Sequence, residues 1–298
     1  MKAGLVAVVG KPNVGKSTLI NAIVGHKVSI VSDKVQTTRK RVLGIATTDE
    51  YQIVFVDTPG IHKPKHKLGA ALNETAKQSI YDIDLVLVMT DCSRMPSPED
   101  KHVSLMLKEA GIFDKPKKLI LGLNKMDKLK AEDVERNFEA YKDLFPTENV
   151  VMTSLIKEQN LDILQGLIVD LLPENPTFYP EDMYTDQPMA FLAAEAVREK
   201  ALHLTREEIP HSIATYCETW ERGEEDNRLL IRVVILTERD GQKAIILGNK
   251  GSMIKEIGIQ ARKDIEEFVG EQIFLELFVK VRADWRQSPR WLKELDYI

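Results

Sequence analysis

The chain has 298 residues, a length that accommodates two domains with sizeable cores. Hydrophobic residues make up 43% and charged residues 29%, and the net charge of −5 gives bulk electrostatics no argument for nucleic acid. The two cysteines, Cys92 and Cys217, form no metal-ligand pattern and favour a reduced, cytosolic setting, and no apolar run approaches the roughly 18 residues of a membrane span.

Residues 1 to 172 alternate short apolar runs with helical stretches. The expected strands are 5–9, 51–56, 84–90, 117–124 and 149–154, and the expected helices include 17–25, 98–110, 131–144 and 160–172. Several of these strands are apolar nearly throughout, which is typical of strands buried on both faces of a parallel sheet. The alternation therefore predicts a doubly wound α/β domain.

Residues 10–17, GKPNVGKS, fit the phosphate-loop pattern G-x-x-x-x-G-K-[ST] between the first strand and the first helix. The glycines let backbone N–H groups close around phosphates, and the helix N-terminus adds the positive end of its dipole. Lys16 is predicted to reach the β- and γ-phosphates, and the Ser17 hydroxyl to ligate Mg²⁺. The predicted phosphate-binding residues are Gly10, Lys11, Pro12, Asn13, Val14, Gly15, Lys16, Ser17 and Thr18.

Two later segments complete the phosphate side of this site. Residues 36–39, QTTR, lie in a polar stretch where a threonine hydroxyl could ligate Mg²⁺; we favour Thr38 over Thr37, with a solvated loop as the alternative. The next motif, about 40 residues after the phosphate loop, is Asp57, Thr58, Pro59 and Gly60. Asp57 is expected to hold Mg²⁺ through water, and the Gly60 backbone to sense the γ-phosphate.

Residues 124–127, NKMD, come directly after the apolar run KKLILGL at 117–123, in the fourth of the expected strands. The Asp127 carboxylate can accept from guanine N1–H and from the N2 amino group, whereas adenine would leave it unpaired. Asn124 is expected to brace neighbouring loops or contact the base, and the Lys125 stem to lie along the base plane. The predicted base-binding residues are Asn124, Lys125, Met126, Asp127, Ser154 and Leu155.

Residues 173–188 contain four prolines and little periodicity, which indicates a linker. After it the expected elements change to a helix at 190–205, strands at 212–221 and 228–236, a helix from 252 and a strand over 273–281. This order, helix, two strands, helix, strand, predicts a small α+β domain. The sequence thus divides into a domain over 1–172, a linker over 173–188 and a domain over 189–298.

Residues 248–251, GNKG, form a G-x-x-G turn that we place between a short apolar strand at 246–247 and the helix from 252. A KH module uses such a turn to clamp the backbone of about four single-stranded nucleotides. Residues 239–263 carry six basic and two acidic side chains, although the segment 183–298 as a whole has four more acids than bases. The predicted RNA-binding residues are Gly248, Asn249, Lys250, Gly251, Ser252 and Lys255; a helix-entry turn with solvated lysines is the alternative.

The motifs GKPNVGKS, QTTR, DTPGIHKP, NKMD and GNKGSMIKEIG occur in an order and at spacings that closely resemble the Era GTPases, over nearly the whole chain. This resemblance implies a P-loop NTPase domain followed by a type II KH domain, and hydrolysis of GTP to GDP with Mg²⁺. It also implies binding to the 3′ end of 16S rRNA, a role in 30S ribosomal-subunit assembly, no DNA partner, and a cytoplasmic protein with peripheral inner-membrane association. The base-backing loop reads Ser154-Leu155 where the family usually has Ser-Ala.

Ile61 occupies the position at which many GTPases carry the glutamine that orients the attacking water. The hypothesis is that backbone groups place this water, with Lys16, Thr38, Gly60 and Asn13 carrying catalysis. In related GTPases an asparagine at the position of Asn13 helps to bind K⁺ beside the phosphates; local hydrogen bonding in the loop is the alternative. GTP and Mg²⁺ are expected to order residues 32–43 and 58–72 and so to control the second domain.

Two other functional classes stay open from the sequence. In one, the chain is mainly an RNA-binding module or chaperone whose nucleotide is a structural ligand. In the other, it is a GTP-binding switch whose second domain docks a protein or membrane partner.

Overall fold

The computed structural model describes residues 1–32, 34, 37–60, 67–80, 83–115, 118–224 and 227–297. These residues fall into two compact units. The first contains residues 1–29 and 38–60 and the described residues of 69–186, and the second contains the described residues of 30–37, residues 67 and 68, and those from 187 onward.

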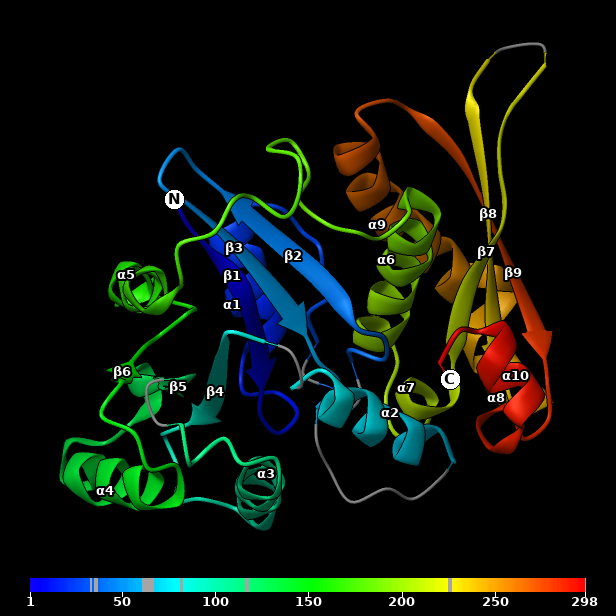
Figure 1. Cartoon of the computed structure of the whole chain (residues 1–298). Coiled ribbons are helices and arrows are strands. Elements are labelled where there is room, and N and C mark those ends of the chain that lie inside the picture. The colour runs from blue at the N-terminus through cyan, green and yellow to red at the C-terminus, as the bar shows by residue number, and fades with distance from the viewer. Residues whose placement is uncertain are drawn as a thin grey trace. The chain divides into compact units, whose positions relative to one another are not determined.

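A six-stranded sheet forms the first unit, in the order β2-β3-β1-β4-β5-β6 (Figure 1). Its strands are β1 (Lys2–Val9), β2 (Val42–Thr47), β3 (Tyr51–Asp57), β4 (Leu85–Asp91), β5 (Leu119–Asn124) and β6 (Val150–Met152). Only β2 runs antiparallel to its neighbour; the other adjacent pairs are parallel. Strands β2 and β3 lie on one side of β1, and β4 to β6 lie on the other. The strand order therefore reverses at β1, which is where sheets of this kind bind ligands.

Helices cover both faces of this sheet. They are α1 (Lys16–Val24), α2 (Lys67–Gln78), α3 (Pro98–Glu109), α4 (Val134–Leu144), which follows the short 3₁₀ turns Met126–Lys128 and Ala131–Asp133, and α5 (Leu161–Leu171). Leu19 of α1 and Leu164 of α5 share one core with Val6 and Val8. Val103 of α3 and Tyr141 of α4 share another core with Val9. Burial on both sides explains why the central strands are apolar nearly throughout.

The predicted α/β class is confirmed, and two elements of this unit, β2 and α2, were not predicted. Strand β2 reads VLGIAT, and glycine is unfavourable in a strand interior. The structure shows why glycine stands there: a Cβ on Gly44 would lie 2.5 Å from Cγ2 of Ile20 on α1. Close packing of the helix on the strand therefore selects a residue that weakens the strand signal.

Residues 173–186 contain no helix or strand and lie along the first unit. The amide of Ile45 in β2 donates to the carbonyl of Tyr184 over 2.9 Å, and the amide of Leu43 donates to Oδ1 of Asp186 over 3.1 Å. Tyr179 and Met183 pack on a small apolar cluster formed by β2 and β3. Residues 173–186 thus cover an apolar cluster on the β2–β3 hairpin, and the described residues of the cluster include none from a helix.

The second unit contains a three-stranded sheet in the order β7-β8-β9 with helices packed on it (Figure 1). Its elements are α6 (Met189–Leu204), α7 (Ile209–Ser212), β7 (Ala214–Arg222), β8 (Leu229–Thr237), α8 (Asp240–Leu247), the 3₁₀ turn Asn249–Gly251, α9 (Ser252–Val269), β9 (Ile273–Val281), the 3₁₀ turn Trp285–Gln287 and α10 (Pro289–Glu294). Strands β7 and β8 are antiparallel, and β8 and β9 are parallel. The core joins α6 and α9 to the sheet through Val197, Ala261 and Ile265, among others.

The expected short strand before the G-x-x-G turn is wrong, because residues 240–247 form helix α8. Oε1 of Gln242 accepts from the amides of Glu238 and Arg239, over 2.8 and 3.2 Å, and so satisfies donors at the helix start. Ile246 is fully buried in the core. Two adjacent apolar residues at the end of a short helix gave the misleading strand signal.

None of the helices in the described part of the chain is long and apolar enough to cross a membrane.

Candidate functional site

The phosphate loop connects β1 to α1, where two glycines permit its course. Gly10 has φ 153°, and a Cβ there would lie 2.3 Å from the carbonyl oxygen of Met89. Gly15 has φ 109°, and its Cβ would meet Nδ2 of Asn124 at 2.5 Å. Both positions therefore require glycine, since a side chain would collide with the neighbouring strand or with the base-binding loop.

Lys16 begins α1 and folds back under the loop. Its Nζ donates to the carbonyl oxygens of Gly10 and Lys11, each over 3.1 Å. Burial lowers the pKa of Lys16 to about 8, although the Asp57 charge acts in the opposite direction. An anionic phosphate bound at the loop would favour the charged ammonium of Lys16, so this lysine is suited to bind a phosphate.

Three oxygen-bearing side chains meet beside the first turn of α1. The Ser17 hydroxyl donates to Oδ2 of Asp57 over 2.9 Å, the Thr38 hydroxyl donates to the same oxygen over 3.2 Å, and the two hydroxyl oxygens lie 3.1 Å apart. Thr37, in contrast, donates its hydroxyl to the Lys34 carbonyl over 2.7 Å. The structure thus brings Thr38, rather than Thr37, to the predicted metal residues.

The chemistry of this cluster fits Mg²⁺. Oδ1 of Asp57 is buried and has no hydrogen-bond partner among the described residues. Burial raises the pKa of the Asp57 carboxyl, against the lowering effects of the Lys16 charge and of hydroxyl hydrogen bonds. A divalent cation would favour the charged form of the carboxyl and could contact this unpaired oxygen, either directly or through water. Hydroxyl and carboxylate oxygens are the ligands that this ion takes.

Gly60 lies against the phosphate loop. A Cβ on Gly60 would be 2.8 Å from Cγ and 2.9 Å from the backbone nitrogen of Pro12. Thr58, before Pro59, is fully buried and donates its hydroxyl to the Val8 carbonyl over 2.7 Å. The segment after β3 is therefore fixed to β1 and to the loop, which brings the predicted γ-phosphate sensor to the phosphate residues. Ile61 lies outside the described residues.

Asn124, at the end of β5, braces the two neighbouring loops. Its Nδ2 donates to the Val14 carbonyl over 2.7 Å, and its Oδ1 accepts from the Leu155 amide over 3.2 Å. Of the two roles that the sequence left open for Asn124, bracing is the one for which the structure gives contacts. It ties the phosphate loop to the base-binding loops.

Asp127 and Lys125 stand on the base side of Asn124. The Ser154 hydroxyl donates to Oδ1 of Asp127 over 2.6 Å, so that a buried serine orients the carboxylate that is expected to read guanine. Lys125 has φ 66°, and its Nζ lies 2.8 Å from Oδ2 of Asp91. Although burial alone would raise it, hydrogen bonds from Lys125 and Ser93 hold the pKa of Asp91 below its usual value.

The remaining predicted nucleotide residues have supporting positions. Val14 and Leu155 are buried in the core beneath the loops, and Met126 begins the short 3₁₀ turn that contains Asp127. Thr18 follows Ser17 in the first turn of α1, and Asn13 has φ 63° and is exposed. The predicted nucleotide-binding residues that the structure describes therefore gather at the carboxyl ends of β1, β3, β5 and β6.

Sequence reasoning missed the acidic partners of Lys11 and Lys125, two of the three lysines of the site. Asp91 holds Lys125, and Asp100 holds Lys11 with Nζ–Oδ2 2.6 Å. Ser97, Pro98 and Asp100 carry the signature of a capping box with proline in the first turn, so the start of α3 was readable. Its contact with the phosphate loop was not, because 86 or more residues separate the partners.

The G-x-x-G turn of the second unit joins α8 to α9. Gly248 has φ 71°, and a Cβ there would lie 2.7 Å from both the Cβ and the amide nitrogen of Met253. Lys250 has φ 51° and Gly251 has φ 81°. Asn249, Lys250, Ser252 and Lys255 are exposed around this turn. The turn thus presents polar and basic side chains beside the N-terminus of an 18-residue helix.

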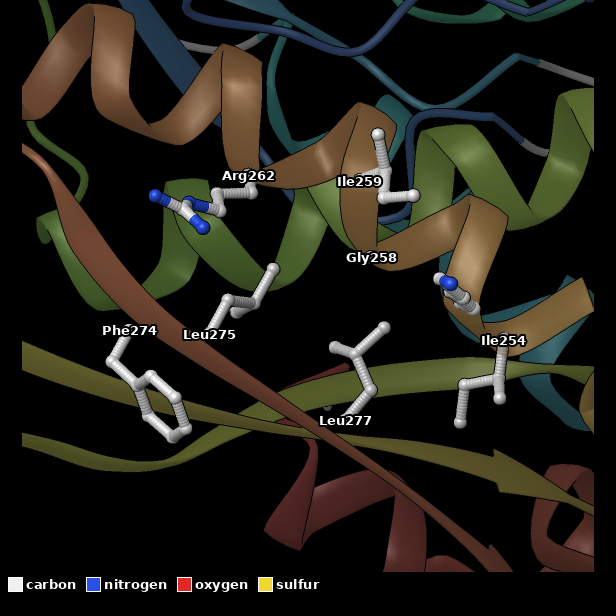
Figure 2. A pocket seen from close by; sticks show the side chains of 8 residues that line it. Ile254, Gly258, Ile259, Arg262, Phe274, Leu275 and Leu277 are labelled. Carbon is white, nitrogen blue, oxygen red and sulfur yellow. The ribbon is translucent and has the colours of Figure 1, made fainter. Parts of the chain in front are cut away.

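A groove of about 360 Å³ lies between α9 and the edge strand β9. Figure 2 shows Ile254, Ile259 and Arg262 on the helix side and Leu275 and Leu277 on the strand side. The full lining is Ile254, Lys255, Gly258, Ile259, Arg262, Phe274, Leu275 and Leu277. An apolar floor with two basic side chains, next to a glycine turn, suits bases with their backbone clamped at the turn.

Comparison with known proteins gives two domain matches. The family described as "50S ribosome-binding GTPase" matches residues 5–125, and the KH domain matches residues 208–286.

Full-length relatives are also similar. "GTPase Era" of Thermoanaerobacter sp. (strain X514) is 45% identical over 296 residues, which cover 99% of this chain and 96% of that protein. "GTPase Era" of Heliobacterium modesticaldum is 42% identical over 297 residues, which cover 100% and 97%.

Two solved structures match the whole chain at 43% identity, covering 100% of it and 99% of the other chain. They are a variant of Aquifex aeolicus Era bound to GDP·AlF₄⁻, with a TM-score of 0.92, and Era in complex with MgGDPNP and nucleotides 1506–1542 of 16S ribosomal RNA, with a TM-score of 0.93.

Proposed function

The chain belongs to the Era family of GTPases, and we propose that it is a nucleotide-controlled, rRNA-binding assembly factor of the 30S ribosomal subunit. As a member of this family it hydrolyses GTP to GDP. The observation that carries the rest of the proposal is the pairing of a phosphate loop and guanine motif in one unit with a G-x-x-G turn and an apolar groove in the other.

The chain's own residues divide the work of GTP hydrolysis. The loop amides and the Lys16 ammonium receive the phosphates, and Asp127 accepts the two N–H groups that distinguish guanine from adenine. Ser17, Thr38 and Asp57 would hold Mg²⁺, which neutralises charge on the β- and γ-phosphates when bound. Gly60 packs against Pro12 of the phosphate loop, and its amide is the group that would meet the γ-phosphate.

We propose that Asn13 helps to bind a K⁺ ion beside the phosphates. Its left-handed backbone conformation is one that asparagine tolerates, and its side chain is exposed at the loop. A monovalent cation held there would add positive charge where other GTPases use an arginine finger. Turnover at equal ionic strength is expected to be faster in K⁺ than in Na⁺, and this difference is expected to vanish in N13A; equal wild-type rates would contradict the proposal.

The RNA partner that we propose is the 3′ end of 16S rRNA. The turn residues Gly248–Gly251 would clamp the backbone of a single strand, and the groove would receive bases against Ile254 and Ile259. Support comes from the 43% identical Era chain, whose complex contains nucleotides 1506–1542 of that RNA.

Crosslinking to total cellular RNA, with a GTP analogue and with GDP, tests this partner. The 3′ end of 16S rRNA is expected to be recovered, with a yield that depends on the nucleotide. A variant with Asn249→Asp and Lys250→Asp places negative charge at the clamp and is expected to lose the crosslink while it still hydrolyses GTP. If the variant crosslinks as well as the wild type, the KH turn is not the RNA site.

Two rival functions are separated by related measurements. If nucleotide were only a structural ligand of an RNA chaperone, phosphate release would equal the uncatalysed background. If the second domain docked a protein or a membrane, RNA recovery would not exceed that of an unrelated protein. The family resemblance also leads us to propose a cytoplasmic protein with peripheral inner-membrane association, which vesicle flotation tests directly.

A further inference from the structure

The side chain of Lys11 leaves the phosphate loop instead of facing a phosphate. Its Nζ lies 2.6 Å from Oδ2 of Asp100 and 3.2 Å from the Ser97 hydroxyl, both at the start of α3. The side chain of Lys11 is 18% exposed and that of Asp100 is 2% exposed. The contact therefore joins the loop to the helix that follows β4, in a setting with little water.

The Asp100 carboxylate is oriented by groups at the start of its own helix, independently of Lys11. Oδ2 of Asp100 accepts from the amide and from the hydroxyl of Ser97, each over 2.8 Å, within the capping box of α3. A carboxylate so deeply buried is costly without an opposite charge, and the Lys11 ammonium supplies that charge. The pair is thus held rigidly from the α3 side, unlike an exposed ion pair between two mobile side chains.

The backbone of Lys11 belongs to the wall of the phosphate site. Its carbonyl oxygen accepts from Nζ of Lys16, and it lies between Gly10, with φ 153°, and Pro12, against which Gly60 packs. Anchoring the Lys11 side chain consequently restrains the peptide groups that hold the phosphate-binding lysine and support the γ-phosphate sensor. Loss of the anchor would leave this end of the loop, which is flanked by a glycine, free to take other backbone conformations.

We propose that Asp100 is a positioning residue for phosphate binding, acting through Lys11 on the phosphate loop. Asp91, the last residue of β4, holds Lys125 on the base side, so the stretch from the end of β4 to the first turn of α3 anchors both lysines. This inference rests on the GTPase function, because it assigns a role to the same nucleotide site.

For Asp100, a positioning role and a purely electrostatic role predict opposite changes in phosphate affinity. Removing the Lys11 charge weakens attraction to a phosphate in either account. Removing the Asp100 charge takes a negative charge away from the site, which by Coulomb's law alone would tighten binding of an anion. If Asp100 acts by positioning, its removal weakens phosphate binding instead.

The test measures dissociation constants for GDP and for guanosine, which carries no phosphate, in the full-length chain. K11M and D100N are each expected to weaken GDP binding about tenfold, as loss of loop alignment would, and to leave guanosine binding within about twofold. K11R keeps the charge and is expected to bind GDP nearly as the wild type does. The K11M/D100N double variant is expected to be no weaker than the weaker single variant, because both singles break one contact.

The exposed pair Lys142–Glu148 in the same unit supplies the control, since K142M removes a paired lysine without touching the site. K142M is expected to bind GDP as the wild type does. Tighter GDP binding by D100N, unchanged GDP binding by K11M, or an equal loss of GDP and guanosine binding would each overturn the proposal. K11M leaves the α3 capping box intact, so unchanged GDP binding by K11M overturns the proposal even if D100N folds poorly. Failure of the wild type to bind GDP would instead contradict the GTPase function itself.

Discussion

Gly60 is the last residue of the motif D-T-P-G, which begins with Asp57 at the end of strand β3. The motif D-T-P-G could have been an ordinary turn, yet its glycine lies against Pro12 with no room for a methyl group. The neighbouring Asp57 keeps one buried carboxylate oxygen without a partner among the described residues. A turn serving only to reverse the chain would need neither feature, so both support the proposed site for a γ-phosphate and its metal.

Substituting Gly60 by alanine is expected to reduce GTP hydrolysis about tenfold and to leave GDP affinity within about threefold. The added Cβ must displace the segment from Pro12, which misplaces the amide that we propose meets the γ-phosphate, a group that GDP lacks. G166A is the matched control, because a Cβ on Gly166 of α5 meets nothing within 4 Å. Single-turnover phosphate release and GDP titration measure both effects; equal losses of hydrolysis in the two variants would contradict the account.

Asp127→Asn tests the guanine assignment. An amide offers one acceptor and one donor where the carboxylate offers two acceptors, so GDP binding is expected to weaken at least about 100-fold. The same variant is expected to bind xanthosine diphosphate better than GDP, because the new amide can donate to the 2-oxo group. D133N makes the same chemical change on an aspartate outside the site and is expected to alter neither affinity. A D127N variant that still prefers GDP would refute the assignment.

Periodicity predicted most helices and strands of the first unit and many of those of the second. Strands buried on both faces carry long apolar runs, so β1, β3, β4 and β5 were readable from sequence. Strand β2 was not, because helix packing requires Gly44 in its middle. Helix α8 was read as a strand at its last two residues, because its start is stabilised by Gln242 rather than by one of the common N-cap residues.

The site was predictable to the extent that it consists of local motifs. GKPNVGKS, DTPG and NKMD each follow a strand of a parallel sheet, so topology alone brings them to one edge. The contacts that orient them cross long stretches of sequence: Asn124 reaches Val14, and Lys11 reaches Asp100. A single sequence gives no signal for such pairs, since either partner has many equally plausible neighbours.

Gln52 illustrates how the proline-rich segment after α5 is held. It is fully buried in β3, its Oε1 accepts from the amides of Phe178 and Tyr179 over 2.7 and 3.0 Å, and its Nε2 donates to the Tyr179 carbonyl. Gln52→Ala leaves these backbone groups unpaired and is expected to lower the free energy of unfolding by about 2–3 kcal/mol. Limited proteolysis is expected to cut within 173–186 first. The exposed Gln78→Ala is the control, and equal stability of the two variants would argue against this account.

The groove beside α9 gives a second test at this scale. Ile259 lines it and is 56% exposed, so aspartate there is expected to weaken binding of a single-stranded 16S 3′-end RNA at least about tenfold without loss of stability. Ile163 on α5 is 55% exposed and does not line the groove, which makes I163D a matched control. Fluorescence anisotropy with labelled RNA measures both variants; equal affinities would exclude the groove as the binding surface.

At the scale of the whole molecule, a segment between two nucleotide motifs belongs to the second unit. Ile30 is buried in that unit's core, the Val31 amide donates to Oε1 of Glu199 over 2.8 Å, and the Thr37 carbonyl accepts from Arg198 of α6.

The residue after Thr37, Thr38, contacts Ser17 and Asp57 in the first unit. Continuity of the chain therefore links a predicted Mg²⁺ ligand to a segment held by the KH-containing unit, which is what nucleotide control requires.

Coupling of this kind is reciprocal, so a nucleotide that changes RNA affinity must have its own affinity changed by RNA to the same degree. The most direct measurement is the affinity of the full-length chain for the 3′ end of 16S rRNA with a non-hydrolysable GTP analogue and with GDP, at one salt concentration. The account predicts a difference of about tenfold or more between the two states. Equal RNA affinities with the two nucleotides would contradict it.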